Sequence, residues 1–518
     1  MSGPTDDSQV PPHPDARSPA VSTSEVAKGA GLAGLARLGA LIEVIAQPAY
    51  TWMFGLTGYG VYVVLWAAIN ILATFLDLAM DQALQRIVPS EESLERQHGA
   101  VRFALLTGTG LGAVAALAIS FSADWLAGFV ATAPEDAVVL PQAIALFAWS
   151  LPLWIFVEVA TAAARAKRAF GPEIRLRIFW EQVARLVFAT GFFLFGLDLT
   201  GLLLGHMLSL AMTAVLSARL LGRYYDGKLL WHAPMCSATR RAVLGGGAAM
   251  MPPAIARRAY NDLPPILLNI MIPGSAGATA AALFGIARKI ASIPLIVRQS
   301  FLYVLSPLAS AQAAVDRSAM LPMYRFSTHM SLLLAVPLTG LMILVSSDIL
   351  TAFAPGSAAA LPLLIILLVA RAGEAVIGPA TPIVEMVSHR ALPLLNSVIG
   401  LSLWLAIGLY LVPDYGATGM ALAVSVAVII TAWVAVIELR LSDRLSPFGS
   451  GFWRAALAGT AIVFLLWVGG EVLASAGASA RALGLFALFW PLLWLGLKLG
   501  LEPRDKLALG KAGLALRL

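Results

Sequence analysis

Apolar stretches of about 20 residues recur along the whole chain, and they restrict the fold more than any other feature of the sequence. A stretch of about 20 apolar residues makes a helix long enough to cross the hydrocarbon core of a bilayer. Of the 518 residues, 59% are hydrophobic and only 12% are charged, about half the charge of a typical soluble domain. The sequence therefore predicts an all-α polytopic membrane protein.

We predict about fourteen membrane-spanning helices. Several contain Pro or Gly, which membrane helices accept because neighbouring helices satisfy the freed backbone groups. The predicted spans are residues 29–53, 60–84, 103–122, 138–163, 176–197, 200–222, 243–271, 277–307, 327–347, 359–387, 392–412, 416–439, 453–473 and 481–500.

The distribution of Lys and Arg orients these spans. With the amino terminus in the cytoplasm, 27 of the 35 Lys and Arg residues fall in cytoplasmic segments, one (Arg481) lies in an outer loop, and seven lie within spans. Cytoplasmic loops of membrane proteins carry such an excess of positive charge. We therefore expect both termini in the cytoplasm. The net charge of +6 reports this topology, and nucleic acid is not an expected partner.

Two segments of the chain resemble each other, residues 55–89 and 273–307. Each opens with a glycine-containing turn, continues as a long helix and stops at a proline 29 or 30 residues after the aligned Gly60 or Gly277. Six predicted spans separate the copies, so both copies run in the same direction through the membrane. Repeats of this kind build transporters whose halves move about a central site.

The repeat predicts two parallel six-helix lobes followed by two C-terminal helices. The predicted parts are a disordered cytoplasmic tail (1–26), an N-terminal lobe with helices 1–6 (27–235), a C-terminal lobe with helices 7–12 (236–445), helices 13 and 14 (446–502) and a second cytoplasmic tail (503–518).

Patterns of Gly, Pro and Tyr at two places resemble a known family. Pro48, the run 58–62 (GYGVY) and the helix end 83–89 (ALQRIVP) resemble the start of Wzx-type polysaccharide flippases of the multidrug/oligosaccharidyl-lipid/polysaccharide (MOP) exporter superfamily. Residues 413–421 (PDYGATGMA) are similar to the turn between helices 11 and 12 of that family. The resemblance covers about residues 29–440, and two additional C-terminal helices are typical of the flippase members.

The resemblance implies a flippase that moves undecaprenyl-pyrophosphate-linked oligosaccharide units across the bacterial inner membrane by alternating access, for surface polysaccharide biosynthesis. The implied partners are the lipid-linked oligosaccharide and membrane lipids, with a polysaccharide polymerase as a candidate protein partner and H⁺ or Na⁺ as candidate coupling ions. A lipid II flippase and a MATE-like drug/cation antiporter have the same fold and remain alternatives.

An enzyme is the alternative from another class. A polytopic polysaccharide polymerase or glycosyltransferase needs a large outer loop with catalytic groups, and the longest predicted outer loop, 123–137, is short. One Cys and six His show no metal-ligand spacing, and no glycine motif for a nucleotide is present. We expect no catalytic residues, no metal and no cofactor.

Five cations fall within the seventh and eighth predicted spans. A cation near the bilayer centre costs roughly 2.5–3.5 kcal/mol on insertion scales, unless it faces water or a partner. Arginine donates bidentate hydrogen bonds to phosphate, so we predict a cationic cavity that binds pyrophosphate. The alternative is pairing with nearby acids, as between Arg258 and Asp262 at i,i+4. The predicted substrate-binding residues are Arg257, Arg258, Arg288, Lys289 and Arg298.

Other charges within the predicted spans have different expected roles. Arg371 and Glu374 lie three residues apart in the tenth span and form either a gate or an ion pair. Glu181 and Arg185 in the fifth span favour a salt bridge.

Carboxylates in spans are candidates for ion coupling, because an isolated acid can exchange a proton as its exposure alternates. Glu43 and Asp77 are favoured over Asp81, Glu158 and Glu385.

Overall fold

The computed structural model describes residues 40–167, 174–297, 320–387 and 391–517. Within these ranges the regular structure is helical and contains no strand. Helices satisfy every interior backbone group without help from water, which explains why an apolar chain of this kind forms them. The predicted all-α fold is therefore confirmed, while the predicted disordered tail 1–26 lies outside the described residues.

The first group of helices comprises α2 (Ala40–Leu76), α3 (Met80–Ser90), α4 (Leu94–Phe121), α5 (Ala123–Ala127), α6 (Pro134–Ala137), α7 (Leu140–Phe147), α8 (Ser150–Ala166), the π-helix η1 (Ile174–Trp180), α10 (Glu181–Leu194), α11 (Leu199–Tyr224) and α12 (Gly227–His232). The second group comprises α13 (Ser237–Met271), α14 (Ser275–Ile290), α16 (Leu321–Leu344), α17 (Ser346–Leu350), η3 (Ser357–Ala360), α18 (Leu361–Val376), α19 (Ala380–Val387), α20 (Ala391–Ser442), α21 (Ser450–Val472), η4 (Ala474–Ala476), α22 (Ala478–Gly500), α23 (Pro503–Ala508) and α24 (Lys511–Ala515).

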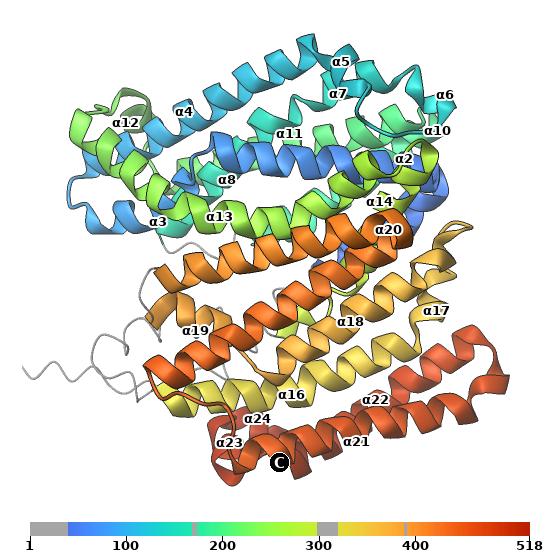
Figure 1. Ribbon diagram of the computed structural model, residues 1–518. Helices are drawn as coiled ribbons and strands as arrows, with labels where there is room; N and C mark the ends of the chain where they lie inside the picture. The colour runs from blue at the N-terminus through green and yellow to red at the C-terminus, as the bar shows by residue number, and fades with distance from the viewer. Residues whose placement is uncertain (1–39, 168–173, 298–319, 388–390, 518) are drawn as a thin grey trace, which may run out of the picture.

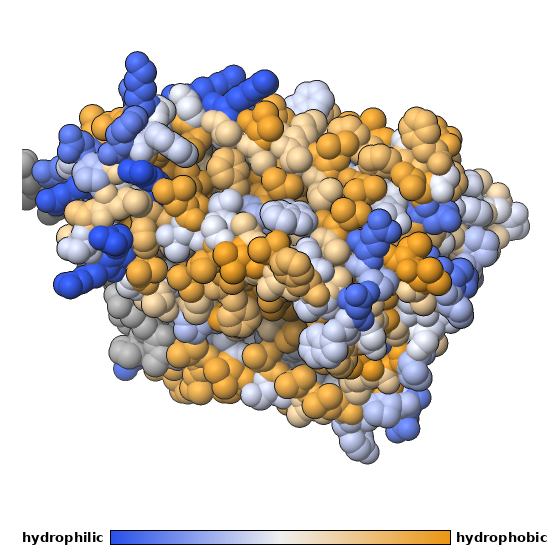
Figure 2. All heavy atoms as spheres, turned by 90° about the horizontal axis from the view of Figure 1, so that it is seen from above, coloured by the Kyte–Doolittle hydropathy of each residue, from blue (hydrophilic) through white to orange (hydrophobic). Residues whose placement is uncertain are grey.

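The long helices lie side by side, and short helices mark the two ends of the bundle (Figure 1). The end at the left of Figure 1 holds α3, α12, α19 and α23, and the right end holds α5, α6 and α17. We call the left end the basic end, because Arg223 at the end of α11, Lys228 in α12 and Arg240 at the start of α13 lie there. Figure 2 shows apolar side chains over the middle of the upper face and hydrophilic side chains toward its ends, as expected for contact with lipid.

The chain reverses direction within α2. Gly55 has φ +68° and ψ 167°, a backbone conformation that glycine adopts at little steric cost. Glu43 before this turn and Trp66 after it line the same small cavity, so the two segments of α2 lie alongside each other. Gly274 (φ +65°) occupies the turn between α13 and α14. Both predicted repeat copies therefore open with a glycine turn.

A second reversal lies within α20, at Gly416 with φ +54°. Gly408 contacts Met420, and the backbone of Leu411 lies against Gly419. These pairs on either side of the turn place the two segments of α20 antiparallel, as the predicted turn between the eleventh and twelfth helices requires.

Nine helices among the described residues are long and apolar enough to cross a membrane. Two of the nine, α2 and α20, contain the reversals at Gly55 and Gly416. α10, α13 and α14 coincide with predicted spans but are too short or too polar to meet the same criteria. The chain is thus a multi-pass membrane protein, and the count of fourteen spans stays a prediction.

The second predicted span is interrupted, which corrects the expectation of a long helix running to Pro89. α2 ends at Leu76, and Leu78 (φ 53°) and Ala79 (φ 52°) adopt the left-handed conformation before α3 begins. Asp77 Oδ1 accepts a hydrogen bond from the Ala79 N–H at 2.7 Å. This side-chain turn satisfies a backbone donor that the interruption frees, and Pro89 lies inside α3.

Helices α13 and α14 lie between the earlier helices and the later ones. α13 packs against α2, α3, α14 and α20, and α14 packs against α2, α18 and α20. The largest buried cluster draws residues from both groups, including Ile155, Phe284 and Trp404. A second cluster joins α16, α21 and α22. The predicted lobe boundary between residues 235 and 236 stays a prediction.

Residues 503–518, predicted as a cytoplasmic tail, contain α23 and α24. Asp505 Oδ2 lies 2.8 Å from His329 Nδ1 of α16, and both side chains are buried. This contact joins the carboxy-terminal segment to the bundle.

Candidate functional site

A polar cavity of about 610 Å³ lies between the amino-terminal helices and α13. We call it the central cavity. Hydrophilic space within an apolar bundle marks the place where a membrane transporter can hold a polar group. Its polar lining consists of Thr74, Asp77, Asp81, Gln82, Gln85, Glu158, Arg257, Arg258 and Asn261.

Arg257 and Arg258 occupy the middle of α13 and have different surroundings. Arg257 is exposed on the cavity wall, and its guanidinium has no ion-pair or hydrogen-bond partner in the part of the chain that the structure describes. Arg258 lies 3.6 Å from Glu158 Oε1 and 3.9 Å from Asp262 Oδ2. Adjacent helical residues point about 100° apart, so one cation faces open space while the other reaches two carboxylates.

Glu158 of α8 brings together arginines from two other elements. Arg177 of η1 donates to both carboxylate oxygens, at 2.9 and 3.1 Å, and Arg258 approaches the same carboxylate from α13. The Arg177 guanidinium also lies 4.6 Å from the centre of the Trp154 ring. The sequence alone did not single out Arg177 for this role, because it lies at the cytoplasmic start of the fifth predicted span, 176–197. The available signal was the i,i+4 spacing of Trp154 and Glu158, which places an aromatic ring and a carboxylate on one face of α8, where both can contact an arginine.

Arg288 and Lys289 of α14 do not line the central cavity. Arg288 donates a hydrogen bond to the Asn261 carbonyl oxygen at 2.5 Å and lies 3.6 Å from Asp262 Oδ1. Lys289 forms an ion pair with Glu43 of α2. The structure therefore separates the predicted cations into a cavity group on α13 and a paired group on α14.

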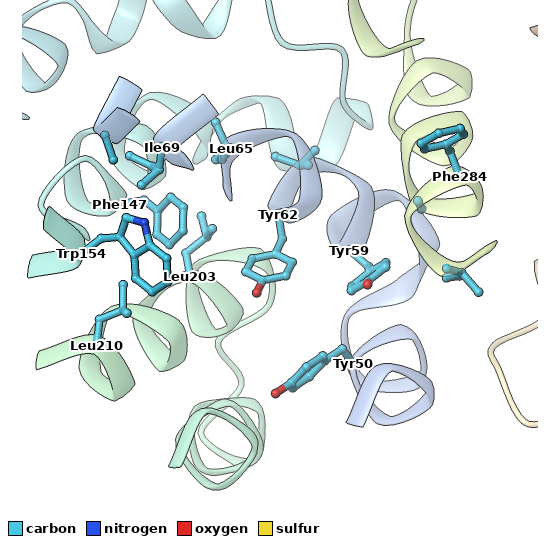
Figure 3. Close-up of a cluster of buried hydrophobic side chains, with 14 of the residues drawn as sticks. Tyr50, Tyr59, Tyr62, Leu65, Ile69, Phe147, Trp154, Leu203, Leu210 and Phe284 are labelled. Atoms are coloured by element: carbon cyan, nitrogen blue, oxygen red, sulfur yellow. The ribbon is translucent and has the colours of Figure 1, made fainter. Parts of the chain in front are cut away.

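The paired group borders a second, much smaller space of about 30 Å³, room for about one water molecule. Tyr50, Tyr59 and Tyr62 of α2 line it from either side of the turn at Gly55 (Figure 3). Arg185 donates to Tyr62 Oη at 3.3 Å and to Glu181 Oε1 at 2.7 Å. The expected salt bridge between Glu181 and Arg185 is thus confirmed, and this region is a buried polar network rather than an open site.

The central cavity carries both signs of charge, whereas the sequence led us to expect a cationic cavity. Asp77, Asp81 and Glu158 line it together with Arg257 and Arg258. Uncompensated charges in a low-dielectric interior are costly, so buried cations are accompanied by acids. The seventh predicted span, with Arg257 and Arg258, coincides with α13, but the sequence did not show which acids face these two cations.

The remaining predicted residues fall in three different places. Arg298 lies outside the described residues. Arg371 Nη1 and Glu374 Oε2 of α18 form an ion pair at 2.5 Å, and neither side chain lines the central cavity. Asp77 lines the central cavity, and no ion-pair partner for it is found among the described residues.

Glu43, the other favoured carboxylate, is held by Lys289. In the described ranges, no group of three or more His, Cys, Asp or Glu side chains could hold a metal ion.

The antiparallel helical hairpins around a charged cavity give the chain a fold similar to that of known MOP superfamily transporters. The chain is similar to the lipid II flippase MurJ in an inward closed conformation (TM-score 0.70, 10% identity, 90% of this chain and 98% of that chain). It is also similar to an inward-facing MATE multidrug resistance transporter (TM-score 0.61, 15% identity, 81% and 94% coverage). A MOP superfamily transporter from Pyrococcus furiosus gives a TM-score of 0.59, with 12% identity and 82% and 96% coverage.

The chain belongs to the family described as polysaccharide biosynthesis protein, whose model matches residues 26–312. No curated protein matches the chain. The family match confirms the resemblance carried by Pro48 and residues 58–62, and the proteins of similar structure are transporters rather than enzymes.

Proposed function

We propose that this protein is a flippase that moves an undecaprenyl-pyrophosphate-linked oligosaccharide across the bacterial inner membrane by alternating access. The observation that carries the proposal is Arg257, a guanidinium without a partner among the described residues, on the wall of a cavity of about 610 Å³. Arginine is suited to phosphate because its planar donors bind two oxygens at once and its charge persists away from water. The family match to polysaccharide biosynthesis proteins supports a glycan as the cargo.

The mixed charge of the central cavity suggests how binding and release proceed. Arg258 is shared between Glu158 and Asp262 at 3.6 and 3.9 Å, which are long distances for ion pairs. We expect an arriving pyrophosphate to bind Arg257 directly and to draw Arg258 away from Glu158 and Asp262. Arg177 stays on Glu158 through its two shorter hydrogen bonds. Glu158 and Asp262 then compete with the pyrophosphate for Arg258, and this competition favours release of the product.

The contacts at the end opposite the basic end support a conformation closed on that side. Trp52 Nε1 donates to the Ala352 carbonyl oxygen at 2.9 Å, and the Ala354 N–H donates to Thr51 Oγ1 at 3.3 Å. The central cavity lies nearer the basic end, because α3 forms part of its wall. With the basic end and both termini in the cytoplasm, substrate enters from the cytoplasmic leaflet.

A polysaccharide polymerase on the outer side is the candidate partner that receives the translocated substrate.

Replacing Arg257 tests the proposal in a host strain that lacks the chromosomal copy. We expect Arg257→Ala to lower surface polysaccharide at least about tenfold, since a charge-assisted hydrogen bond is worth about 1.5–3 kcal/mol. Lipid-linked oligosaccharide accumulates inside the cell, and Arg257→Lys keeps part of the activity. Arg240→Ala, at an exposed site on the basic end outside the cavity, is the matched control. Normal polysaccharide with Arg257→Ala at wild-type protein level overturns the proposal.

A drug/cation antiporter is the second candidate, and the observation in its favour is the pair Asp77 and Asp81 on the cavity wall. Such a protein expels a cationic dye from cells, and Asp77→Asn abolishes that efflux while Arg257→Ala does not. A lipid II flippase is distinguished by depleting the protein from cells. If the protein moves lipid II, depletion stops growth, and the cells accumulate the peptidoglycan precursor instead of the glycan precursor.

A further inference from the structure

A groove of about 500 Å³ lies on the outside of the amino-terminal helices, between η1 and α11. It shares no lining residue with the central cavity, and the proposed flippase cycle makes no use of it. The groove is lined by Arg175, Leu176 and Trp180 of η1 and by Leu216, Arg219, Leu220 and Arg223 of α11.

The α11 side of the groove is a regular amphipathic face. Leu216, Arg219, Leu220 and Arg223 follow the spacing i, i+3, i+4, i+7, which places them on one side of a helix. Leu220 is buried against Ala164 and forms the floor, while both arginines are exposed in the last two turns, at the basic end. The face is therefore apolar toward the membrane interior and cationic toward the bundle end.

The η1 side turns two arginines in opposite directions. Two residues advance a helix by roughly half a turn, so Arg177 reaches Glu158 at the central cavity while Arg175 lines the groove. Trp180 is 52% exposed, as is usual for a tryptophan in the interfacial region of a membrane. The short π-helix thus adds a third cation and an aromatic wall to the groove.

We propose that this groove binds an anionic glycerophospholipid, such as phosphatidylglycerol, from the leaflet at the basic end. The guanidinium groups of Arg175, Arg219 and Arg223 hold the phosphodiester, and an acyl chain lies on Leu216 and Trp180. Charge complementarity supports this occupant, because in the described ranges none of the three arginines has an ion-pair partner. Basic pockets between membrane helices on the cytoplasmic side are suited to lipid head groups of this kind.

A bulk lipid fits the groove better than the transported substrate does. The groove opens on the outside of the bundle, and its walls apart from the three arginines are apolar. Apart from the three arginines and the indole N–H of Trp180, these walls lack the hydrogen-bonding side chains that a saccharide needs, whereas an acyl chain needs none. The ligand is therefore a lipid with a small anionic head group.

Lipid binding to the purified full-length chain in a neutral detergent tests the proposal. We expect phosphatidylglycerol to remain bound in native mass spectrometry and to raise the thermal unfolding temperature, while phosphatidylcholine does neither. Each basic residue near an anionic lipid contributes about fivefold to affinity. The double variant Arg219→Ala/Arg223→Ala should therefore bind phosphatidylglycerol about 25-fold more weakly.

The matched control is Arg240→Ala/Arg241→Ala, which removes two exposed arginines from the same end but outside the groove. Its phosphatidylglycerol affinity should equal that of the wild type, as should that of Arg257→Ala, so this test is independent of the proposed flippase activity. Leu216→Asn, which keeps the charge of the groove unchanged, should weaken binding by removing an apolar contact for the acyl chain. Where the double variant does not fold, the single variant Arg219→Gln should bind about fivefold more weakly.

Three results overturn the proposal. One is equal phosphatidylglycerol binding by the double variant and the wild type. Another is equal protection by glycerol 3-phosphate, which makes the groove a site for free anions rather than lipid. The third is retention of undecaprenyl pyrophosphate in preference to phosphatidylglycerol at the same arginines, which makes the groove a substrate site.

Discussion

Asn269 and Ala131 are joined by two hydrogen bonds although 138 positions separate them in the sequence. The Ala131 N–H donates to Asn269 Oδ1 at 2.9 Å, and Asn269 Nδ2 donates to the Ala131 carbonyl oxygen at 2.8 Å. Asn269 is buried near the end of α13, and Ala131 precedes α6. The amide joins α13 to the amino-terminal helices at the end opposite the basic end. In the proposed cycle this pair breaks when that end opens.

Replacing Asn269 therefore favours opening of the outer side. Asn269→Ala removes both hydrogen bonds, each worth about 0.5–1.5 kcal/mol, so the closed conformation loses about 1–3 kcal/mol. This shifts the conformational equilibrium about 5- to 150-fold toward the outward-open state. The measurement is the labelling rate of an Ala354→Cys reporter, which is buried in the closed structure and keeps the backbone hydrogen bond to Thr51, in a Cys236→Ser background.

The control is Thr279→Ala, because among the described residues the Thr279 hydroxyl bonds only to the Ser275 carbonyl oxygen of its own helix. Its labelling rate should match the parent. An unchanged rate in Asn269→Ala would show that the pair does not hold the outer side closed.

Gly60 provides a second test of the same closure. A Cβ at residue 60 would lie 1.9 Å from the Ala278 carbonyl oxygen of α14, a backbone atom that cannot turn away. Gly60→Ala should separate α2 from α14, raise labelling of the Ala354→Cys reporter and lower export. Gly58→Ala is the matched control, because its nearest contact is 3.9 Å from the added atom. Equal export by both variants would contradict the proposed closure.

Local sequence signals predicted the hairpin turns and the family. Gly55, Gly274 and Gly416 each occupy a turn between helices, and each has positive φ. Glycine has this freedom in any context, so the position of a glycine between two apolar runs was sufficient information. The break after Asp77 carried no such signal, because it depends on a close approach from α13. A Cβ at Gly247 would lie 2.2 Å from the Leu78 carbonyl oxygen.

Charge pairing at the site could not be predicted for a related reason. Glu158, Arg177 and Arg258 come from α8, η1 and α13, and only tertiary packing brings them together. Sequence spacing reveals partners within one helix, such as Arg371 and Glu374. Partners on different helices have no fixed spacing, so the acids of the central cavity remained unassigned until the structure placed them.

Glu158 should contribute to stability through its two arginines. Glu158→Gln leaves Arg177 and Arg258 facing each other without the carboxylate. We expect a loss of about 1–3 kcal/mol, less than for a fully buried pair because these side chains are partly exposed. Thermal unfolding in detergent should occur at a lower temperature. Adding Arg177→Met should restore part of the loss, since it removes one of the two arginine charges that approach each other at this site.

The control for this prediction is Glu91→Gln, which breaks a solvent-exposed pair with Arg96 at 3.7 Å. Exposed pairs contribute about 0–1 kcal/mol, so its unfolding temperature should stay near that of the wild type. Equal unfolding temperatures for Glu158→Gln and Glu91→Gln would contradict a structural role for the Glu158 cluster.

Asp77 is the better placed of the two favoured candidates for ion coupling. It lines the central cavity, whereas Glu43 is held in an ion pair by Lys289. Asp77→Asn cannot ionise, but its side-chain oxygen can still accept the hydrogen bond that the Ala79 N–H now donates, so the break between α2 and α3 is preserved. We expect this variant to transport substrate in proteoliposomes at a rate that no longer responds to an imposed pH or Na⁺ gradient.

Glu43→Gln is the comparison, because it removes a carboxylate of the ion pair without changing the central cavity. It should retain the response to the gradient and lose stability instead, since Lys289 keeps its charge without a partner. A wild-type gradient response in Asp77→Asn, or its loss in Glu43→Gln alone, would move the coupling site from the central cavity to the small polar network beside Tyr50.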